Sequence, residues 1–267
     1  MPAANPLLER WRANEPTLGG WMTTADPQIA EYLAGAGFDE ICVDQQHGFA
    51  DRATIGSVFR AIELYGVAPT TRVPRNDFAD IGKALDLGAV AIVVPMVGSP
   101  EEAANAAAAC HFPPGGLRSV GPLRGSLLRG HHRLEGLDQA ACVVMIETSD
   151  GVRNADAIAA TPGVDAIYIG PGDLALGLGL SAWPDDWSRD EASIHAEAIE
   201  RIRTACVKHG VAPGIHTGDG RTANRYREQG FLMITVASDL GLIAKGAGDE
   251  LAWARGTADT PAQPTAV

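Results

Sequence analysis

A short apolar run followed by a helical segment recurs along almost the whole chain. Runs such as EICVD, TTRVP, AIVVPM and VVMIE are rich in β-branched residues and continuous rather than alternating in polarity. Strands of this kind are buried on both faces, which is typical of parallel sheets covered by helices. Between the runs lie segments with helical spacing of apolar residues, for instance residues 192–210 with Ala198 and Ile202 on one face. Strands are expected at residues 18–23, 40–48, 68–74, 91–96, 142–146, 166–170, 211–216 and 231–237, and helices at 6–14, 26–34, 52–65, 78–87, 100–110, 154–160, 192–210, 219–229 and 239–253.

Eight such units predict an α/β fold, a closed (β/α)8 barrel of the TIM type in a single domain. The length of 267 residues is usual for that fold. An open, doubly wound sheet is the alternative, but the glycine-dense segment GPGDLALGLG lacks the helix and the downstream acid that a dinucleotide-binding fingerprint requires. We expect the barrel to cover residues 1–253, with 176–190 as a loop. Residues 254–267 are small, polar and proline-bearing, and we expect a flexible tail there.

The charge and hydropathy of the chain exclude several classes of partner. A formal net charge of -12 disfavours nucleic acid and anionic membranes, because neither surface attracts such a chain over long range. No apolar run approaches the roughly 20 residues of a membrane span, and the N-terminus lacks the apolar core of a signal peptide. We therefore expect a cytoplasmic protein. The four cysteines show no CxxC spacing and are expected to be buried free thiols.

Two acids end successive strands. Glu147 ends the run VVMIE, and Asp173 follows the run AIYIG in the sequence GPGD. If the two strands are parallel neighbours, both acids emerge at the carboxyl edge of the sheet, where barrels place their chemistry. Two carboxylates there repel unless one is protonated or both share a cation, and we favour a divalent metal ion. Helix capping by either acid, or an ion pair of Glu147 with Arg153, is the alternative.

Further polar residues stand at the expected strand ends. His47 follows the second strand and can act as a base near neutral pH if a carboxylate, from Asp86 or Asp44, holds its ring. Arg72 lies within the apolar run TTRVP, where an unpaired guanidinium is costly, so it is expected to face the barrel mouth and an anion. His216 ends the seventh strand.

The motifs VDQQHG, TRVP, LDLGAVAIVVPMVGSPEEA and FPPGGLRSVG, with residues 143–179 and 234–247, resemble the HpcH/HpaI aldolases. These are class II pyruvate aldolases related to 4-hydroxy-2-oxoheptanedioate aldolase, and the resemblance runs from about Leu18 to Ala247. It implies a barrel that cleaves or forms 4-hydroxy-2-oxo acids, with pyruvate and an aldehyde as partners. It also implies a divalent metal (magnesium, manganese or cobalt) in place of a Schiff-base lysine, and no lysine stands at an expected strand end. A homo-oligomer, a hexamer with exchanged last helices, is implied as well.

By this resemblance Glu147 and Asp173 are the metal ligands. The backbone amides of Gly172 and Asp173 would hold the carboxylate of pyruvate, and glycine would allow the chain to approach closely. Arg72 would neutralise the keto or enolate oxygen. His47, oriented by Asp86, would be the acid/base acting through a water molecule.

The chain departs from the family pattern at three positions. Met145 stands where glutamine is expected two residues before the metal glutamate, Gln46 stands where an acid is common, and His216 replaces an apolar residue. Met145 and His216 are therefore expected to contact the substrate in an altered pocket. Two other functions fit the same residues: another enolate-forming lyase or decarboxylase of the superfamily, or a non-catalytic barrel that binds small acids. The joint presence of a histidine, an arginine and two acids disfavours the last.

Overall fold

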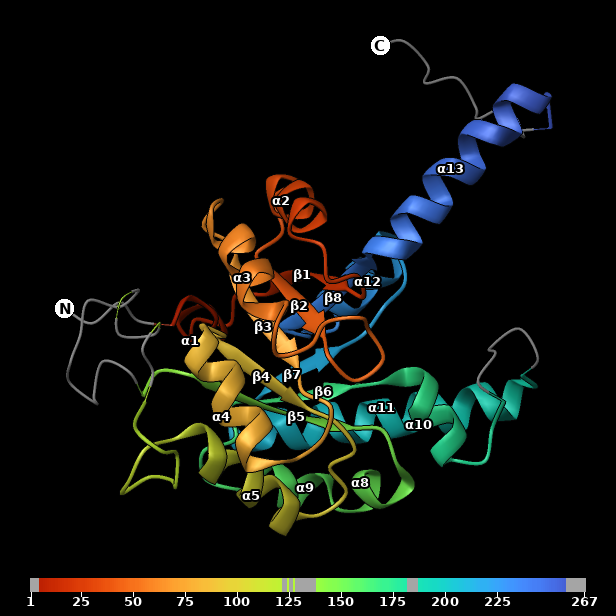
Figure 1. The fold of residues 1–267 in the computed structure, drawn as a ribbon. Coiled ribbons are helices and arrows are strands. Elements are labelled where there is room, and N and C mark those ends of the chain that lie inside the picture. The colour runs from red at the N-terminus through yellow and green to blue at the C-terminus, as the bar shows by residue number, and fades with distance from the viewer. Residues whose placement is uncertain (1–4, 122–123, 125–126, 128–137, 182–186, 258–267) are drawn as a thin grey trace.

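The computed structural model describes residues 5–121, 124, 127, 138–181 and 187–257. Eight parallel strands pair in chain order, and the last pairs with the first to close a barrel (Figure 1). This confirms the predicted (β/α)8 architecture. The strands are β1 (Thr17–Met22), β2 (Glu40–Asp44), β3 (Ala68–Arg72), β4 (Ala91–Val94), β5 (Ala141–Ile146), β6 (Ala166–Ile169), β7 (Ala212–Ile215) and β8 (Met233–Ser238).

Helices surround the barrel and α1 closes its amino end. They are α1 (Pro6–Arg12), α2 (Pro27–Gly35), α3 (Ile55–Glu63), α4 (Phe78–Leu87), α5 (Pro100–Cys110), α8 (Ser149–Arg153), α9 (Ala155–Ala159), α10 (Pro171–Gly177), α11 (Arg189–His209), α12 (Gly220–Glu228) and α13 (Asp239–Arg255). Polar caps fix several of the helix starts. Asp77 accepts hydrogen bonds from two backbone amides of α4, and Ser99 forms a capping box with Glu102 in α5.

The apolar core has two layers, one on each side of the strands. Residues such as Val43, Ile92 and Val144 point outward and are buried beneath the helices, whereas Val93 and Tyr168 fill the barrel interior. Continuous apolar strands are the sequence counterpart of this double burial. The four cysteines are free and buried, as predicted.

Two predicted segments differ from the structure. The helix expected at 154–160 is α9, and a further short helix that was not predicted, α8, precedes it; the two break at Asn154, where the side-chain amide donates to Gly98 O at 2.7 Å. The predicted loop at 176–190 missed the end of α10, a helix that starts at Pro171 and buries Leu174 and Ala175. So short a helix depends on tertiary packing rather than on its own propensity, and this packing is not visible in the sequence.

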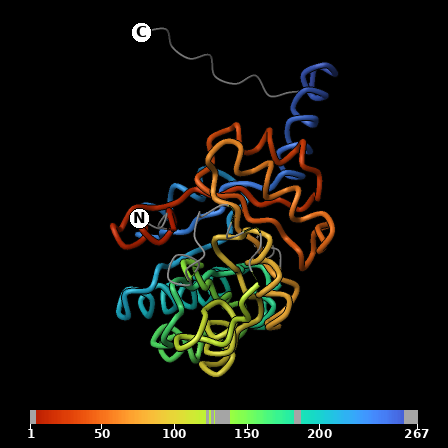
Figure 2. Tube along the Cα trace, turned by 60° about the vertical axis from the view of Figure 1, so that its left-hand side comes forward, coloured from red at the N-terminus to blue at the C-terminus, as the bar shows by residue number. Residues whose placement is uncertain are grey.

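The last helix, α13, stands away from the barrel (Figures 1 and 2). It is about 25 Å long from its 17 residues, and Asp239 is its only buried residue. It ends at Arg255 rather than at the predicted 253, and residues 258–267 of the expected tail lie outside the described part of the chain. Among the described residues, no helix is both long enough and apolar enough to cross a membrane.

One carboxyl group, that of Glu40, is sealed inside the barrel. Glu40 begins β2 opposite Gly19 of β1, and a Cβ at Gly19 would lie 3.0 Å from its Oε1. Within the described residues its Oε2 has no hydrogen-bond partner. Burial raises the pKa of Glu40 to about 7, helped by the charge of Asp39 and opposed by the hydroxyl of Thr70.

The raised pKa of Glu40 predicts a loss of stability between pH 4.5 and pH 7. In this range the folded protein keeps a proton on Glu40 that the unfolded chain, with an ordinary pKa of 4.5, has already released. Rising pH therefore favours the unfolded state, by about 3 kcal/mol in total. In urea unfolding at pH 4.5, 6 and 8, Glu40→Gln should remove this share of the pH dependence. A variant with the same pH dependence as the wild type would contradict the assignment.

Candidate active site

A cavity of about 350 Å³ opens at the carboxyl ends of the strands. Barrels place their chemistry at this end. Six of the eight residues predicted for the site line it: His47, Arg72, Met145, Gly172, Asp173 and His216. Glu147 and Asp86 do not line it. Glu147 is buried directly after β5, and Asp86 lies in the last turn of α4.

Glu147 follows β5 directly and is buried at the mouth of the barrel. Its Oε1 accepts a hydrogen bond from the backbone amide of Met96 at 2.8 Å. Its Oε2 is buried and has no partner in the described part of the chain. Burial raises the pKa of Glu147 to about 7, against the Met96 hydrogen bond and the charge of Arg72, and the negative charge of Asp173 raises it further. The predicted alternative, an ion pair with Arg153, is wrong because Arg153 pairs with Asp150.

Asp173 lies in the first turn of α10 and is exposed to the cavity. It does not cap the helix: the N-cap is Gly170, and no side chain caps this end. The first amides of a helix have no acceptor within it, so the N–H groups of Gly172 and Asp173 are free to bind an anion. Buried His195 of α11 holds this turn, with Nε2 2.9 Å from Pro171 O.

Gly170 makes room for the acid. A Cβ at this position would lie 2.6 Å from Glu147 Oε2 and 2.5 Å from Met145 Cε. The unpaired oxygen of Glu147 therefore points at the junction between β6 and α10, where Asp173 follows three residues later. Among the described residues, no group of three or more His, Cys, Asp or Glu side chains gathers as a metal cage. A cation here would thus rest on two protein carboxylates and take its remaining ligands from small molecules.

Arg72 and Asp44 form a buried ion pair across β3 and β2. Arg72 donates from Nε to Oδ1 at 2.9 Å and from Nη2 to Oδ2 at 2.5 Å. Trp21 completes the arrangement, because its Nε1 donates to Asp44 Oδ2 at 3.3 Å and its ring lies 5.0 Å below the guanidinium. Burial alone would raise the pKa of Asp44, but the hydrogen bonds and charge of Arg72 lower it below its ordinary value. The guanidinium is therefore charged, held in one orientation and still part of the cavity wall.

His47 lies on the loop after β2, with its side chain exposed. Its backbone amide donates to Asp44 Oδ1 at 3.4 Å, as that of Gln46 does at 3.0 Å. Gly48 packs tightly beneath the loop, since a Cβ there would lie 2.2 Å from Asp44 O. Asp44 thus fixes the backbone of the loop, whereas the His47 ring makes no hydrogen bond to any described residue.

Asp86 does not meet His47 within this chain. It lies in the last turn of α4, which runs from the carboxyl end of β3 back to the amino end of β4, whereas His47 follows the carboxyl end of β2. Asp86 instead pairs with buried Arg118 at 3.0 Å. The two residues occupy opposite ends of one barrel, so the expected dyad is not formed by a single copy.

His216 follows β7 and lines the cavity beside Trp21, their rings meeting edge to face at 4.9 Å. Its Nδ1 lies 3.3 Å from Tyr168 Oη, which in turn lies 2.5 Å from Thr235 Oγ1. Sequence reasoning missed Trp21, Tyr168 and Thr235. All three stand inside apolar strands, where periodicity marks burial but does not say which interior side chains reach the mouth.

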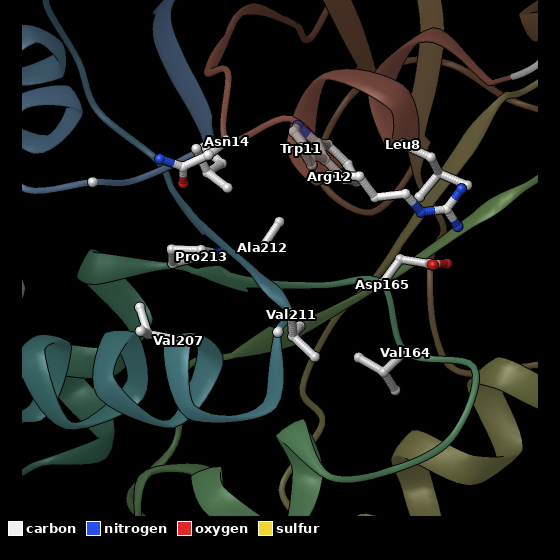
Figure 3. A pocket seen from close by; sticks show the side chains of 13 residues that line it. Leu8, Trp11, Arg12, Asn14, Val164, Asp165, Val207, Val211, Ala212 and Pro213 are labelled. Atoms are coloured by element: carbon white, nitrogen blue, oxygen red, sulfur yellow. The ribbon is translucent and has the colours of Figure 1, made fainter.

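A larger cavity of about 570 Å³ lies at the amino end of the barrel (Figure 3). Val207 and Val211 border it together with Arg12 and Asp165. The carboxylate of Asp165 is already engaged there, accepting the amide of Cys142 at 2.9 Å. Because this cavity lies at the end of the barrel opposite to the carboxyl ends of the strands, it is not the candidate active site.

Comparison with known proteins agrees with the geometry. The model of the family "HpcH/HpaI aldolase/citrate lyase" matches residues 17–246. A hydroxypyruvate/pyruvate aldolase of Rhizorhabdus wittichii is 37% identical over 94% of this chain and 99% of its own. A 4-hydroxy-2-oxo-heptane-1,7-dioate aldolase of Salmonella newport is 36% identical over 91% of this chain and 92% of its own.

A solved structure extends the agreement to the fold. An HpcH/HpaI aldolase/citrate lyase family protein from Burkholderia cenocepacia J2315 superposes with a TM-score of 0.85 at 35% identity, covering 94% of this chain and 100% of the other. The family model, the curated relatives and the solved barrel thus cover the same region. The chain belongs to the HpcH/HpaI aldolase/citrate lyase family of enzymes.

Proposed function

We propose that the chain is a divalent-metal-dependent aldolase that cleaves or forms 4-hydroxy-2-oxo acids through a pyruvate-type enolate and an aldehyde. One observation carries the proposal: the buried Oε2 of Glu147 has no partner among the described residues and lies against Gly170, three residues before Asp173, at a cavity that Asp173 and Arg72 line. The relatives from R. wittichii and S. newport are named for aldolase activity, which supports the same reaction class.

Glu147 and Asp173 would hold the metal ion. An unpaired buried carboxylate is costly, and a cation compensates it directly. Two carboxylates are hard oxygen ligands, which suit magnesium, manganese or cobalt and leave positions open for a substrate. When bound, such an ion polarises the keto oxygen of a 2-oxo acid and stabilises negative charge as it develops there.

The protein's own residues would bind and orient the 2-oxo acid. The free N–H groups of Gly172 and Asp173 would hold its carboxylate. Apart from the adjoining residues and the backbone of its own helix, no atom of the described residues lies within 4 Å of a Cβ built on Gly172. Arg72, fixed by Asp44, would place its positive charge next to the keto or enolate oxygen. Met145 is buried beside Gly170, so the wall there is apolar.

His47 would move the proton of the aldol step through a water molecule. Its exposed ring lies at the cavity, and its loop is fixed by Asp44. The orienting role predicted for Asp86 stays a proposal, and it requires a second copy of the chain to bring that acid to the ring. The first test of the whole proposal is release of pyruvate from 4-hydroxy-2-oxo acids with added magnesium or manganese.

Glu147→Gln should abolish metal binding and turnover together. The amide has the size of the acid but not its charge, so we expect metal affinity and kcat each to fall by at least about 100-fold. Titration with Mn²⁺ and an assay of pyruvate release measure the two. Glu40→Gln is the matched control, since it changes a buried acid at the other end of the same barrel. Full activity of Glu147→Gln would remove the metal assignment.

His47→Ala should separate catalysis from metal binding. Loss of a general acid/base costs about 10²–10⁴ in rate, whereas the carboxylates that hold the metal are untouched. The assay is pyruvate release, run beside the same Mn²⁺ titration. His209→Ala on α11, where the ring contacts Asp156 instead, is expected to behave as wild type. Loss of metal binding in His47→Ala would show that the role is wrong.

We further propose that the protein is a homo-oligomer in which α13 docks on a second copy. Five large apolar side chains of this projecting helix are exposed: Leu240, Leu242, Ile243, Leu251 and Trp253. A helix without tertiary packing is marginally stable in water. Leu18, on the outer face of β1, is also 37% exposed. The helix α13 follows β8, the strand next to β1, but does not fold back to cover Leu18. Exchange of α13 between copies would bury both surfaces.

Ile243→Asp should therefore yield a smaller assembly than the wild type. A charge at a buried interface costs several kcal/mol unless it is paired, so light scattering at micromolar concentration should show a drop in mass. Leu64→Asp, at a still more exposed apolar position that caps the end of α3, is the control and should keep the wild-type mass. A monomeric wild type would contradict the proposal.

A further inference from the structure

His216 is tied to the barrel interior through one of its ring nitrogens. Its Nδ1 lies 3.3 Å from Tyr168 Oη, and that hydroxyl lies 2.5 Å from Thr235 Oγ1. Both partners are buried inside the barrel. The interior hydroxyls therefore engage Nδ1, and only the other ring nitrogen, Nε2, can form a hydrogen bond to a ligand.

The second nitrogen, Nε2, is available to a ligand. Within the described part of the chain it has no hydrogen-bond partner, and it is not among the buried polar atoms that lack one. His216 lines the same cavity as Asp173 and Arg72. Trp21 fixes the plane of the ring by its edge-to-face contact, and Trp21 is itself held by Asp44. The ring thus presents Nε2 to the cavity in a fixed orientation.

The imidazole is neutral at physiological pH. Burial and the charge of Arg72 lower the pKa of His216 to about 4, against the opposing charge of Asp44. A neutral ring has one N–H and one lone pair. The hydroxyls of Tyr168 and Thr235 can each donate or accept, so these hydrogen bonds are compatible with either tautomer of His216. Nε2 accepts a hydrogen bond in one tautomer and donates one in the other.

A hydroxyl group is the simple substituent that satisfies both tautomers. It donates when Nε2 accepts and accepts when Nε2 donates, whereas a carboxylate can only accept and a methyl group does neither. A site built to hydrogen-bond a substrate hydroxyl discriminates against the analogue without it, because the polar group of the protein is then left unpaired. The chemistry at Nε2 therefore selects between aldehydes that differ in one hydroxyl.

We propose that His216 is a specificity-determining residue that favours acceptor aldehydes carrying a hydroxyl next to the carbonyl. This inference rests on the proposed aldolase function, in which Gly172, Asp173 and Arg72 bind the carboxylate and keto groups of the 2-oxo acid. The aldehyde then binds in the rest of the cavity, which His216 lines. Tyr168 is then a positioning residue that acts through the ring of His216.

The test compares two aldehydes of nearly equal size, glycolaldehyde and propanal, with pyruvate as the donor. The wild type should prefer glycolaldehyde by about tenfold in kcat/KM, the value of one neutral hydrogen bond. His216→Phe keeps an aromatic ring and should bring the ratio close to one, while His216→Gln keeps a hydrogen-bonding group and should retain part of it. A ratio near one in the wild type, or an unchanged ratio in His216→Phe, would overturn the inference.

Tyr168→Phe gives a second, independent measurement. It removes the hydroxyl that fixes Nδ1, and we expect the glycolaldehyde preference to fall about threefold. Tyr226→Phe, on α12 beside Phe231, is the matched control and should leave the ratio unchanged. An unchanged ratio in Tyr168→Phe would contradict the positioning role.

Exchange of the methyl protons of pyruvate with solvent needs no aldehyde. Its absence from the wild type means that the proposed function fails. Its presence together with a glycolaldehyde-to-propanal ratio near one means that only this inference fails.

Discussion

The carboxylate of Glu147, buried with one oxygen that has no partner in the part of the chain that the structure describes, is the constraint around which the mouth of the barrel is built. Its other oxygen is held by the amide of Met96, a residue with a left-handed backbone (φ 59°) that non-glycine residues seldom adopt. Gly170 leaves the space into which the free oxygen points. A strained backbone and an obligatory glycine at one carboxylate are costs that a fold retains where function requires them.

The ion pair of Arg72 with Asp44 serves a different purpose at the mouth. Asp44 accepts two hydrogen bonds from Arg72 and one from Trp21. It also accepts hydrogen bonds from the backbone amides of Gln46 and His47, which start the loop after β2. A single acid thus orients the cationic, aromatic and loop elements of the cavity. Removing one partner of such a buried pair leaves the other charge uncompensated, so the pair has to be considered as a unit.

Much of the fold could be predicted from the sequence because parallel strands buried on both faces produce continuous apolar runs. The ends of those runs also located Asp173, Arg72 and His216 at one cavity, with Glu147 directly after β5 beside it. Interior side chains such as Tyr168 could not be assigned, since their contacts arise from closure of the barrel. The pairing of His47 with Asp86 within one chain, in contrast, could have been excluded from the predicted barrel, because a helix between parallel strands carries its last turn back to the amino end of the next strand.

In the proposed reaction, Glu147 and Asp173 hold a divalent cation that activates a 2-oxo acid. The most direct measurement is the exchange of pyruvate methyl protons for deuterium, followed by proton NMR in deuterium oxide with purified protein. We expect exchange that requires added magnesium or manganese and stops when a chelator removes the metal. Exchange at the same rate in chelator-treated protein, or no exchange with any divalent metal, would contradict it.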